Sequence, residues 1–90
     1  MILKSIFEPQ FLKMFKKLPL LIRERSVKAF KNLEEGFSRG LNLEKIKGYD
    51  TLYSIRIDDD YRALGNKKGD TVCWEWIGPH DEYMRRIRRG

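Results

Sequence analysis

Apolar side chains near the start of the chain change from a strand-like to a helical spacing. Residues 2–7 place side chains alternately on two sides and predict a short first strand. Pro9 suits the first turn of a helix, where proline is tolerated. Apolar residues then follow Phe11 at distances of one, four and seven positions, at Leu12, Phe15 and Leu18. These positions predict an amphipathic helix that ends at Pro19, because proline interrupts helical hydrogen bonding.

A second stripe at helical spacing predicts a helix from about Leu20 to Glu35. The stripe consists of Ile22, Ser26, Ala29, Phe30, Leu33 and Phe37. Gly36 is well placed to cap the C-terminus of this helix. Two helices joined at a proline predict a helical hairpin. A polar connection that contains Gly40 and Gly48 leads into the second half of the chain.

From Leu52 the apolar positions alternate with a period of two, which is typical of strands. Tyr53, Ile55 and Ile57 are expected on one face, opposite Ser54, Arg56 and Asp58. The predicted elements are a strand from Leu52, a turn at Asp58–Asp60, a strand at Tyr61–Gly65, a hairpin loop at Asn66–Asp70, a strand at Val72–Ile77 that stops at Gly78-Pro79, and a short helix at Asp81–Arg89. In the last strand, Val72, Trp74 and Trp76 are expected on one face.

This order of elements predicts one α+β domain that spans residues 1–90. An N-terminal strand and a helical hairpin precede a three-stranded antiparallel meander and a short C-terminal helix. The first strand must join the same sheet, or the sheet is left with an exposed edge. Hydrophobic residues make up 41% of the 90 residues, which is enough for a packed core.

The chain is strongly charged and basic. Charged residues make up 36% of it, against about a quarter in an average domain, and the net charge is +6. This charge favours phosphate polymers, acidic proteins or anionic lipid as partners. One cysteine and one histidine exclude a disulfide framework and a zinc-ligand set. No apolar run approaches membrane-spanning length. We therefore expect a soluble cytoplasmic protein without metal, cofactor or membrane partner.

Two arginines in the predicted meander are candidates for binding a phosphate. Arg56 lies in one strand and Arg62 in the next, and a tight turn at residues 58–60 brings them close together. Guanidinium groups hold phosphate in a bidentate manner and stay charged. The alternative is that each arginine pairs with a nearby carboxylate, either Glu75 or one of the three aspartates at 58–60.

His80 and Tyr83 follow the last strand. Histidine titrates near neutral pH and is a natural proton shuttle, and loops at sheet ends often carry function. Tyr83 can donate a hydrogen bond or stack on a base. The alternatives are a capping or exposed histidine, and a tyrosine that packs in the core one helical turn before Ile87.

Two basic clusters are candidates for RNA contact through phosphate attraction. They are Lys13, Lys16 and Lys17 on the first helix, and Arg85, Arg86, Arg88 and Arg89 at the C-terminus. The alternative for the arginines is a solvated helix end, where the helix dipole favours cations.

Three segments together resemble the RelE/ParE superfamily of toxins: "LNLEKIKG", "LYSIRIDDDYRAL" and "WEWIGPHDEY". The order of elements and the length also match, so the resemblance spans nearly the whole chain. It implies a small twisted sheet with two helices on one side. RelE-like members are mRNA endonucleases that cut on the ribosome, without metal, through the RNA's own 2′-hydroxyl. ParE-like members inhibit DNA gyrase, and both kinds are held inactive by a cognate antitoxin.

The resemblance also implies roles for single residues. Arg56 matches a basic strand residue near the cleaved phosphate, and Arg62 matches an arginine that stabilises the transition state. His80 lies near the position of a catalytic arginine in RelE and of a catalytic histidine in YafQ-like relatives. Tyr83 lies where several members place an aromatic that orients the substrate. The chain departs from RelE at Ser54, where RelE has a lysine, and in the acidic neighbours of His80.

We therefore expect a type II toxin that cleaves mRNA on the ribosome and binds an acidic antitoxin. The alternatives are a ParE-like toxin that inhibits gyrase and a non-catalytic member that only binds an antitoxin. The proton acceptor for the 2′-hydroxyl is left open among Glu75, Asp81 and Glu82.

Overall fold

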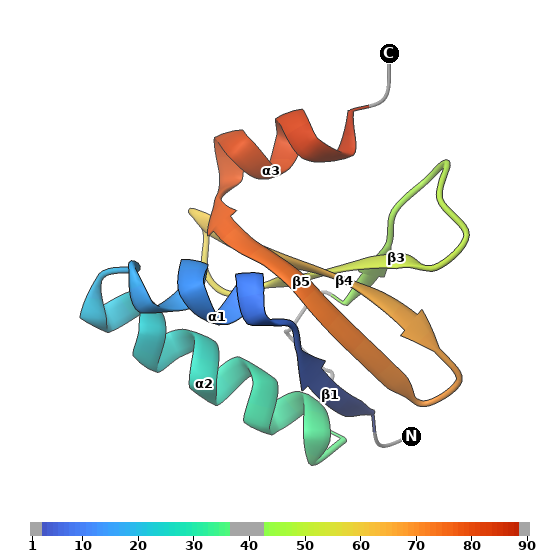
Figure 1. The fold of residues 1–90 in the computed structure, drawn as a ribbon, viewed down its shortest axis with the longest axis horizontal. Helices are drawn as coiled ribbons and strands as arrows, with labels where there is room; N and C mark the ends of the chain where they lie inside the picture. The colour runs from blue at the N-terminus through green and yellow to red at the C-terminus, as the bar shows by residue number, and fades with distance from the viewer. Residues whose placement is uncertain (1–2, 37–42, 89–90) are drawn as a thin grey trace.

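A computed structural model of the chain describes residues 3–36 and 43–88 and shows helices on both faces of a five-stranded sheet (Figure 1). The elements are β1 (Lys4–Phe7), α1 (Pro9–Lys16), α2 (Leu20–Glu34), β2 (Glu44–Lys45), β3 (Leu52–Arg56), β4 (Tyr61–Lys68), β5 (Thr71–Pro79) and α3 (His80–Ile87). The predicted α+β class and the order of the predicted elements are confirmed, with β2 as an addition. None of the described helices is long and apolar enough to cross a membrane.

The sheet has the strand order β1-β5-β4-β3-β2. β1 pairs in parallel with β5, and all other neighbours are antiparallel. The expectation that the first strand joins the same sheet is thereby confirmed. The segment before Leu52 was predicted to be a polar connection without a strand. This prediction was wrong for Glu44 and Lys45, which form the edge strand β2 against β3. A strand of two polar residues has no alternation of apolar and polar positions, so the sequence could not reveal it.

The hairpin of α1 and α2 covers one face of the sheet (Figure 1). Three of its boundaries follow the predicted signals, with Pro9 in the first turn of α1, Pro19 before α2, and Gly36 at a positive φ of 85° after α2. The first helix ends at Lys16, earlier than the predicted end at Pro19. The predicted stripe of α2 is buried at Ile22, Ser26, Ala29, Phe30 and Leu33. Phe37 and Gly40 lie outside the described residues.

Trp74 of β5 lies at the centre of the core beneath these helices and is fully buried. Its ring packs edge-on against Phe30 at 5.0 Å between centroids. Its indole Nε1 donates a hydrogen bond of 3.0 Å to Ser5 Oγ in β1. The Glu8 N–H, just before α1, donates to the Trp74 carbonyl oxygen at 3.0 Å. One tryptophan therefore joins β5, β1, the start of α1 and α2.

The prediction that Val72, Trp74 and Trp76 share one face was wrong. Leu64 pairs with Trp76 but Gly65 pairs with Trp74, so Glu75 is an extra residue on β5 and forms a bulge. The bulge turns Trp76 to the opposite face, where it joins a second core cluster with Ile46, Leu64 and Tyr83. This second cluster anchors α3 on the sheet.

The predicted hairpin loop at residues 66–70 was too long. β4 continues to Lys68 and β5 begins at Thr71, so the turn consists of Gly69 and Asp70. Gly69 adopts a φ of +60°, the left-handed conformation that a tight hairpin turn requires. β5 also continues through Gly78 to Pro79, and α3 begins directly at His80.

Gly65 lies beside the bulge and directly against Trp74. A Cβ atom at this position would come within 2.8 Å of Trp74 Cε3, Val72 Cγ1 and the Cys73 carbonyl oxygen. Real Cβ atoms do not approach so closely, so any side chain here would push β4 away from β5.

We expect Gly65→Ala to lower the free energy of unfolding by about 1–3 kcal/mol, because the added methyl group overpacks the strand pair. Urea unfolding followed by tryptophan fluorescence measures this. Lys68→Ala, at an exposed position of the same strand, serves as the control and should change stability by less than about 0.5 kcal/mol. Equal stability of the two variants would contradict the close packing at Gly65.

Candidate functional site

The four residues predicted to be catalytic line one hollow on the face of the sheet that carries α3. The hollow has a volume of about 240 Å³. Its lining consists of Glu44, Ser54, Arg56, Arg62, His80, Tyr83 and Met84. Four elements, β2, β3, β4 and α3, contribute these side chains. The structure therefore brings Arg56, Arg62, His80 and Tyr83 together.

Sheet register places the two arginines side by side. Arg56 in β3 is the direct partner of Arg62 in β4. Directly paired residues of an antiparallel sheet point to the same face, so both guanidinium groups emerge on one side. The predicted proximity of the two arginines is confirmed.

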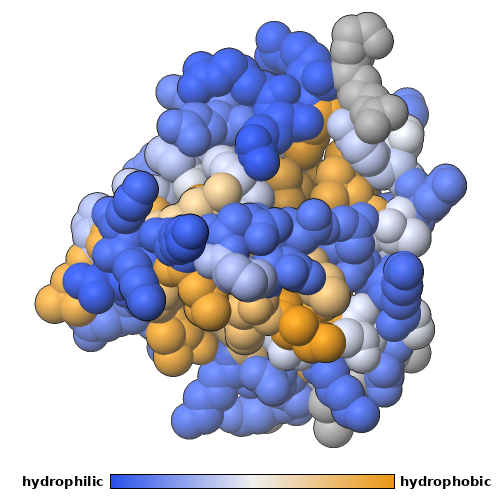
Figure 2. Space-filling model, in the orientation of Figure 1, coloured by the Kyte–Doolittle hydropathy of each residue, from blue (hydrophilic) through white to orange (hydrophobic). Residues whose placement is uncertain are grey.

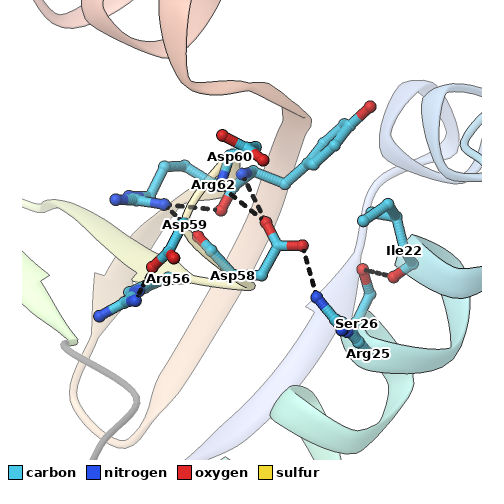
Figure 3. Close-up of polar contacts among 9 residues, drawn as sticks. Ile22, Arg25, Ser26, Arg56, Asp58, Asp59, Asp60 and Arg62 are labelled. Atoms are coloured by element: carbon cyan, nitrogen blue, oxygen red, sulfur yellow. Dashed lines mark hydrogen bonds and ion pairs between the residues drawn. The ribbon is translucent and has the colours of Figure 1, made fainter.

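The turn at residues 58–60 organises both arginines (Figure 3). Asp58 Oδ1 accepts hydrogen bonds from the backbone N–H groups of Asp60 and Tyr61, at 2.8 and 2.9 Å. An aspartate that binds the backbone two residues ahead in this way is a common stabiliser of tight turns. The predicted turn is confirmed, and its first carboxylate holds it closed.

Each arginine is held by this turn in a different way. Arg56 forms an ion pair with Asp59, which is the carboxylate pairing considered as an alternative. Arg62 instead donates through Nη1 to the backbone carbonyl oxygens of Asp58 and Tyr61. Because its partners are neutral carbonyls, the positive charge of Arg62 is not compensated by a carboxylate there.

His80 is fixed by a backbone contact to the same turn. The His80 N–H donates to the Asp60 carbonyl oxygen at 2.7 Å. This bond ties the first residue of α3 to the loop between β3 and β4, 20 positions earlier. The His80 side chain is half-buried and lines the hollow, with its ring centroid 5.7 Å from that of Tyr83. The alternative of a fully exposed histidine does not apply.

Tyr83 combines both of its predicted environments. Its ring is 8% exposed and belongs to the second core cluster, as the packing alternative predicted. Its hydroxyl group reaches the hollow and donates to Ser54 Oγ at 3.3 Å. Ser54 is itself buried and occupies the position where the resemblance pointed to a lysine in RelE.

Glu44 lines the hollow and was not recognised from sequence. It is the one carboxylate among the lining residues, and the short strand β2 places it there opposite Ser54. The three candidates for a proton acceptor lie elsewhere. Glu75 accepts a hydrogen bond from Asn66 in another hollow, Glu82 lines a separate hollow with Arg85 and Arg86, and Asp81 is exposed. The chain offered no signal for Glu44, because its contact depends on strand pairing alone.

Comparison with known proteins identifies the family. A model described as the ParE-like toxin domain matches residues 21–85, which include every residue of the hollow. The chain belongs to the ParE-like toxin domain family. The resemblance to the RelE/ParE superfamily that the sequence indicated is thereby confirmed. No curated protein matches the chain significantly.

Solved structures of toxins share the fold of this ParE-like chain. A chain of the RelB-RelE antitoxin-toxin complex from Methanococcus jannaschii is 25% identical, with a TM-score of 0.77 over 92% of this chain and 99% of that one. A mutant of the E. coli toxin RelE in the free state is 23% identical, with a TM-score of 0.70 over 98% and 100% of the two chains. A chain of the E. coli DinJ-YafQ complex is only 10% identical, with a TM-score of 0.69 over 89% and 96%.

Among the described residues, the basic side chains predicted to contact RNA lie outside the hollow of this ParE-like domain. Lys13, Lys16 and Lys17 are exposed on or just after α1. Arg85 and Arg86 are exposed on α3, and the Arg86 guanidinium lies 5.3 Å from the centre of the Trp76 ring. Arg88 follows α3, and Arg89 lies outside the described residues. Their contact with RNA stays a prediction.

Within residues 3–36 and 43–88, no group of three His, Cys, Asp or Glu side chains could hold a metal ion.

The Asp58 turn yields a prediction about stability. Asp58→Ala removes the acceptor of two backbone N–H groups, and we expect it to lower the free energy of unfolding by about 1–3 kcal/mol. Asp58→Asn keeps a side-chain oxygen for those bonds and loses only the ion pair with Arg25, so its cost should stay below about 1 kcal/mol. Urea unfolding compares the two, and equal losses would contradict the role of the turn.

Proposed function

We propose that the chain is the toxin of a type II toxin–antitoxin pair and cleaves mRNA on the ribosome. The single observation that carries this proposal is the convergence of Arg56, Arg62, His80 and Tyr83 on one hollow. Cleavage would proceed by attack of an RNA 2′-hydroxyl on the adjacent phosphorus. The P–O5′ bond breaks, leaving a 2′,3′-cyclic phosphate and a free 5′-hydroxyl. The nucleophile would come from the RNA, and the protein side chains would supply the proton transfers and the positive charge.

The arginine pair would stabilise the charge that develops on the phosphate. The pentavalent transition state carries more negative charge on its oxygens than the ground state does, and prepositioned donors lower its energy. Arg56 and Arg62 are direct partners in the sheet, and the 58–60 turn holds both. Because the turn orients them before RNA arrives, little reorganisation would be needed during the reaction.

Two proton transfers accompany this attack. The 2′-hydroxyl must lose a proton, and the departing 5′-oxygen must gain one. Among the residues that line the hollow, His80 and Glu44 are the side chains suited to these tasks. We assign proton donation to His80, and we assign proton acceptance to the Glu44 carboxylate. Tyr83, held at its hydroxyl by Ser54, would orient the substrate beside His80.

An acidic antitoxin is the proposed partner of this toxin. Solved structures of relatives in fold are RelB-RelE and DinJ-YafQ complexes. The net charge of +6 favours a negatively charged partner that folds upon binding. Docking on the ribosome, in the cytoplasm, would use the exposed lysines of α1 and the arginines of α3, so it should weaken with salt.

Inhibition of DNA gyrase is the second candidate function, because the matching family model describes ParE-like toxins. A toxin of that kind needs no proton shuttle, so His80 would be dispensable. A member that only binds an antitoxin would cause no growth arrest at all.

Mapping mRNA 5′ ends after induction separates these functions. Cuts in phase with codons support the endonuclease, whereas a DNA-damage response with intact mRNA supports gyrase as the target.

We expect His80→Ala to lower the rate of mRNA cleavage on ribosomes about a hundredfold to ten-thousandfold, as loss of a proton-transfer group does. Arg62→Ala should also abolish toxicity, since it removes charge from the site. Circular dichroism and urea unfolding verify that both variants remain folded. Full toxicity in either folded variant would disprove the assigned site.

Glu44→Gln tests the proton acceptor separately. Glutamine keeps the size of the side chain but cannot accept the proton, so we expect cleavage to slow at least about a hundredfold with unchanged stability. Glu24→Gln makes the same chemical change at an exposed position of α2 and should cut at the wild-type rate. If Glu44→Gln also cut normally, another group would have to accept the proton.

A further inference from the structure

A second, polar hollow lies next to the first and shares Arg56 with it. It has a volume of about 330 Å³ and is formed by α2 together with the end of β3 and the turn that follows. Its lining consists of Arg25, Lys28, Ala29, Asn32, Arg56, Ile57 and Asp58. Arg56 therefore borders two hollows, and the proposed reaction uses only one of them.

Hydrogen-bond donors dominate this second hollow. Lys28 and Asn32 are four positions apart on α2, so they lie on the same side of the helix. Arg25 is one turn earlier and reaches across to Asp58 Oδ2 at 3.0 Å (Figure 3). The other oxygen of Asp58 is occupied by the two turn N–H groups. The one carboxylate of the lining is thus engaged at both oxygens.

The remaining charge of the hollow is positive. Three cationic side chains and one carboxylate line it, and Asp59 pairs with Arg56 from outside the lining, which leaves one net positive charge, that of Lys28. Lys28 is exposed and forms no ion pair with any residue that the structure describes. A free ammonium group beside an amide and two guanidinium groups is suited to a phosphate oxygen.

The position of Arg56 on β3 explains how one residue serves both hollows. β2 pairs only with Tyr53 and Ser54, so within the described residues the end of β3 has no strand beside it on that side. Arg56 projects toward the α3 face, as Ser54 does, yet it is near an open edge of the sheet. Arg56 therefore lies where the α3 face of the sheet meets the side covered by α2.

We propose that the second hollow binds the phosphate of a nucleotide adjacent to the cleaved one. Arg56 would contact both phosphates, while Lys28, Asn32 and Arg25 hold the neighbouring one. This inference rests on the proposed function and adds a binding site to it. It predicts that RNA wraps around the end of β3 and does not lie on the α3 face alone.

The polar lining favours RNA over a protein partner. A folded peptide needs apolar contacts, and this hollow offers only Ala29 and Ile57. Such contacts gather elsewhere, in a groove between α1 and α2 where apolar atoms are exposed in quantity (Figure 2). That groove is lined by Phe7, Phe11, Leu12, Phe15, Val27 and Phe30, with Lys31 and Glu34.

Lys28→Gln tests the proposal with a matched control in the same helix. The probe is a 2′-O-methyl RNA hexanucleotide, which lacks the attacking hydroxyl and stays intact. Each phosphate contact contributes about 0.7 to the slope of log affinity against log salt for a single strand. We expect Lys28→Gln to reduce the slope by about 0.7 and to weaken binding about threefold to fivefold at low salt. Lys31→Gln, which removes the same charge beside the apolar groove, should leave the slope unchanged.

Cleavage assays separate this inference from the proposed function. Lys28→Gln should require more toxin for half-maximal cleavage of ribosome-bound mRNA, yet reach the wild-type rate at saturation. His80→Ala should show the opposite, with normal binding of the hexanucleotide and a cleavage rate that stays low even at saturating toxin. If the wild-type chain cuts mRNA and Lys28→Gln binds the hexanucleotide with an unchanged slope, the subsite is wrong and the function stands.

The remaining outcomes are also decisive. If Lys28→Gln weakens hexanucleotide binding as expected but the wild-type chain cuts no mRNA, the phosphate site stands and the proposed reaction fails. Failure of the wild-type chain to bind the hexanucleotide overturns the phosphate site, whereas the proposed reaction is judged by mRNA cleavage on the ribosome alone. If Lys28→Gln weakens binding of a poly-glutamate peptide but not of the hexanucleotide, the hollow is a site for acidic peptides and the inference is overturned.

Discussion

The bulge in β5 is the constraint on which the rest of this fold depends. One extra residue, Glu75, turns Trp74 and Trp76 to opposite faces of the sheet. Trp74 then anchors β1, α1 and α2, while Trp76 forms the base on which α3 packs. In a regular strand both rings would point to the same face, and α3 would lack the side chain that anchors it. Because Gly65 has no side chain, β4 can approach Trp74 closely enough to pair with the bulged strand β5.

The turn at residues 58–60 carries this arrangement into the site. Its backbone carbonyl oxygens accept hydrogen bonds from the His80 N–H and the Arg62 guanidinium. Its carboxylates form ion pairs with Arg25 and Arg56. A short acidic segment therefore positions the basic groups without removing them from the surface. The one carboxylate that lines the hollow, Glu44, comes from a different strand, β2.

Much of the fold could be predicted from the chain because its signals are local. The two helices are marked by prolines at their starts, and Gly36 follows α2. The alternation from Leu52 correctly assigned Arg56 and Ser54 to one face and Ile55 to the other. The errors arose where no local signal exists. β2 is two polar residues long, and the turn between β4 and β5 is shorter than its composition suggested because both strands extend through polar residues that pair across the hairpin.

By itself, the sequence determined an α+β chain with a basic surface, two adjacent strand arginines and a histidine after the last strand. It did so because helical and strand periods are properties of neighbouring residues. Only the tertiary structure decided that Trp76 leaves the first core, that His80 is tied to Asp60, that Glu44 enters the hollow and that Arg56 borders a second one. These contacts depend on strand register and on backbone hydrogen bonds between distant residues, and neither leaves a pattern along the chain.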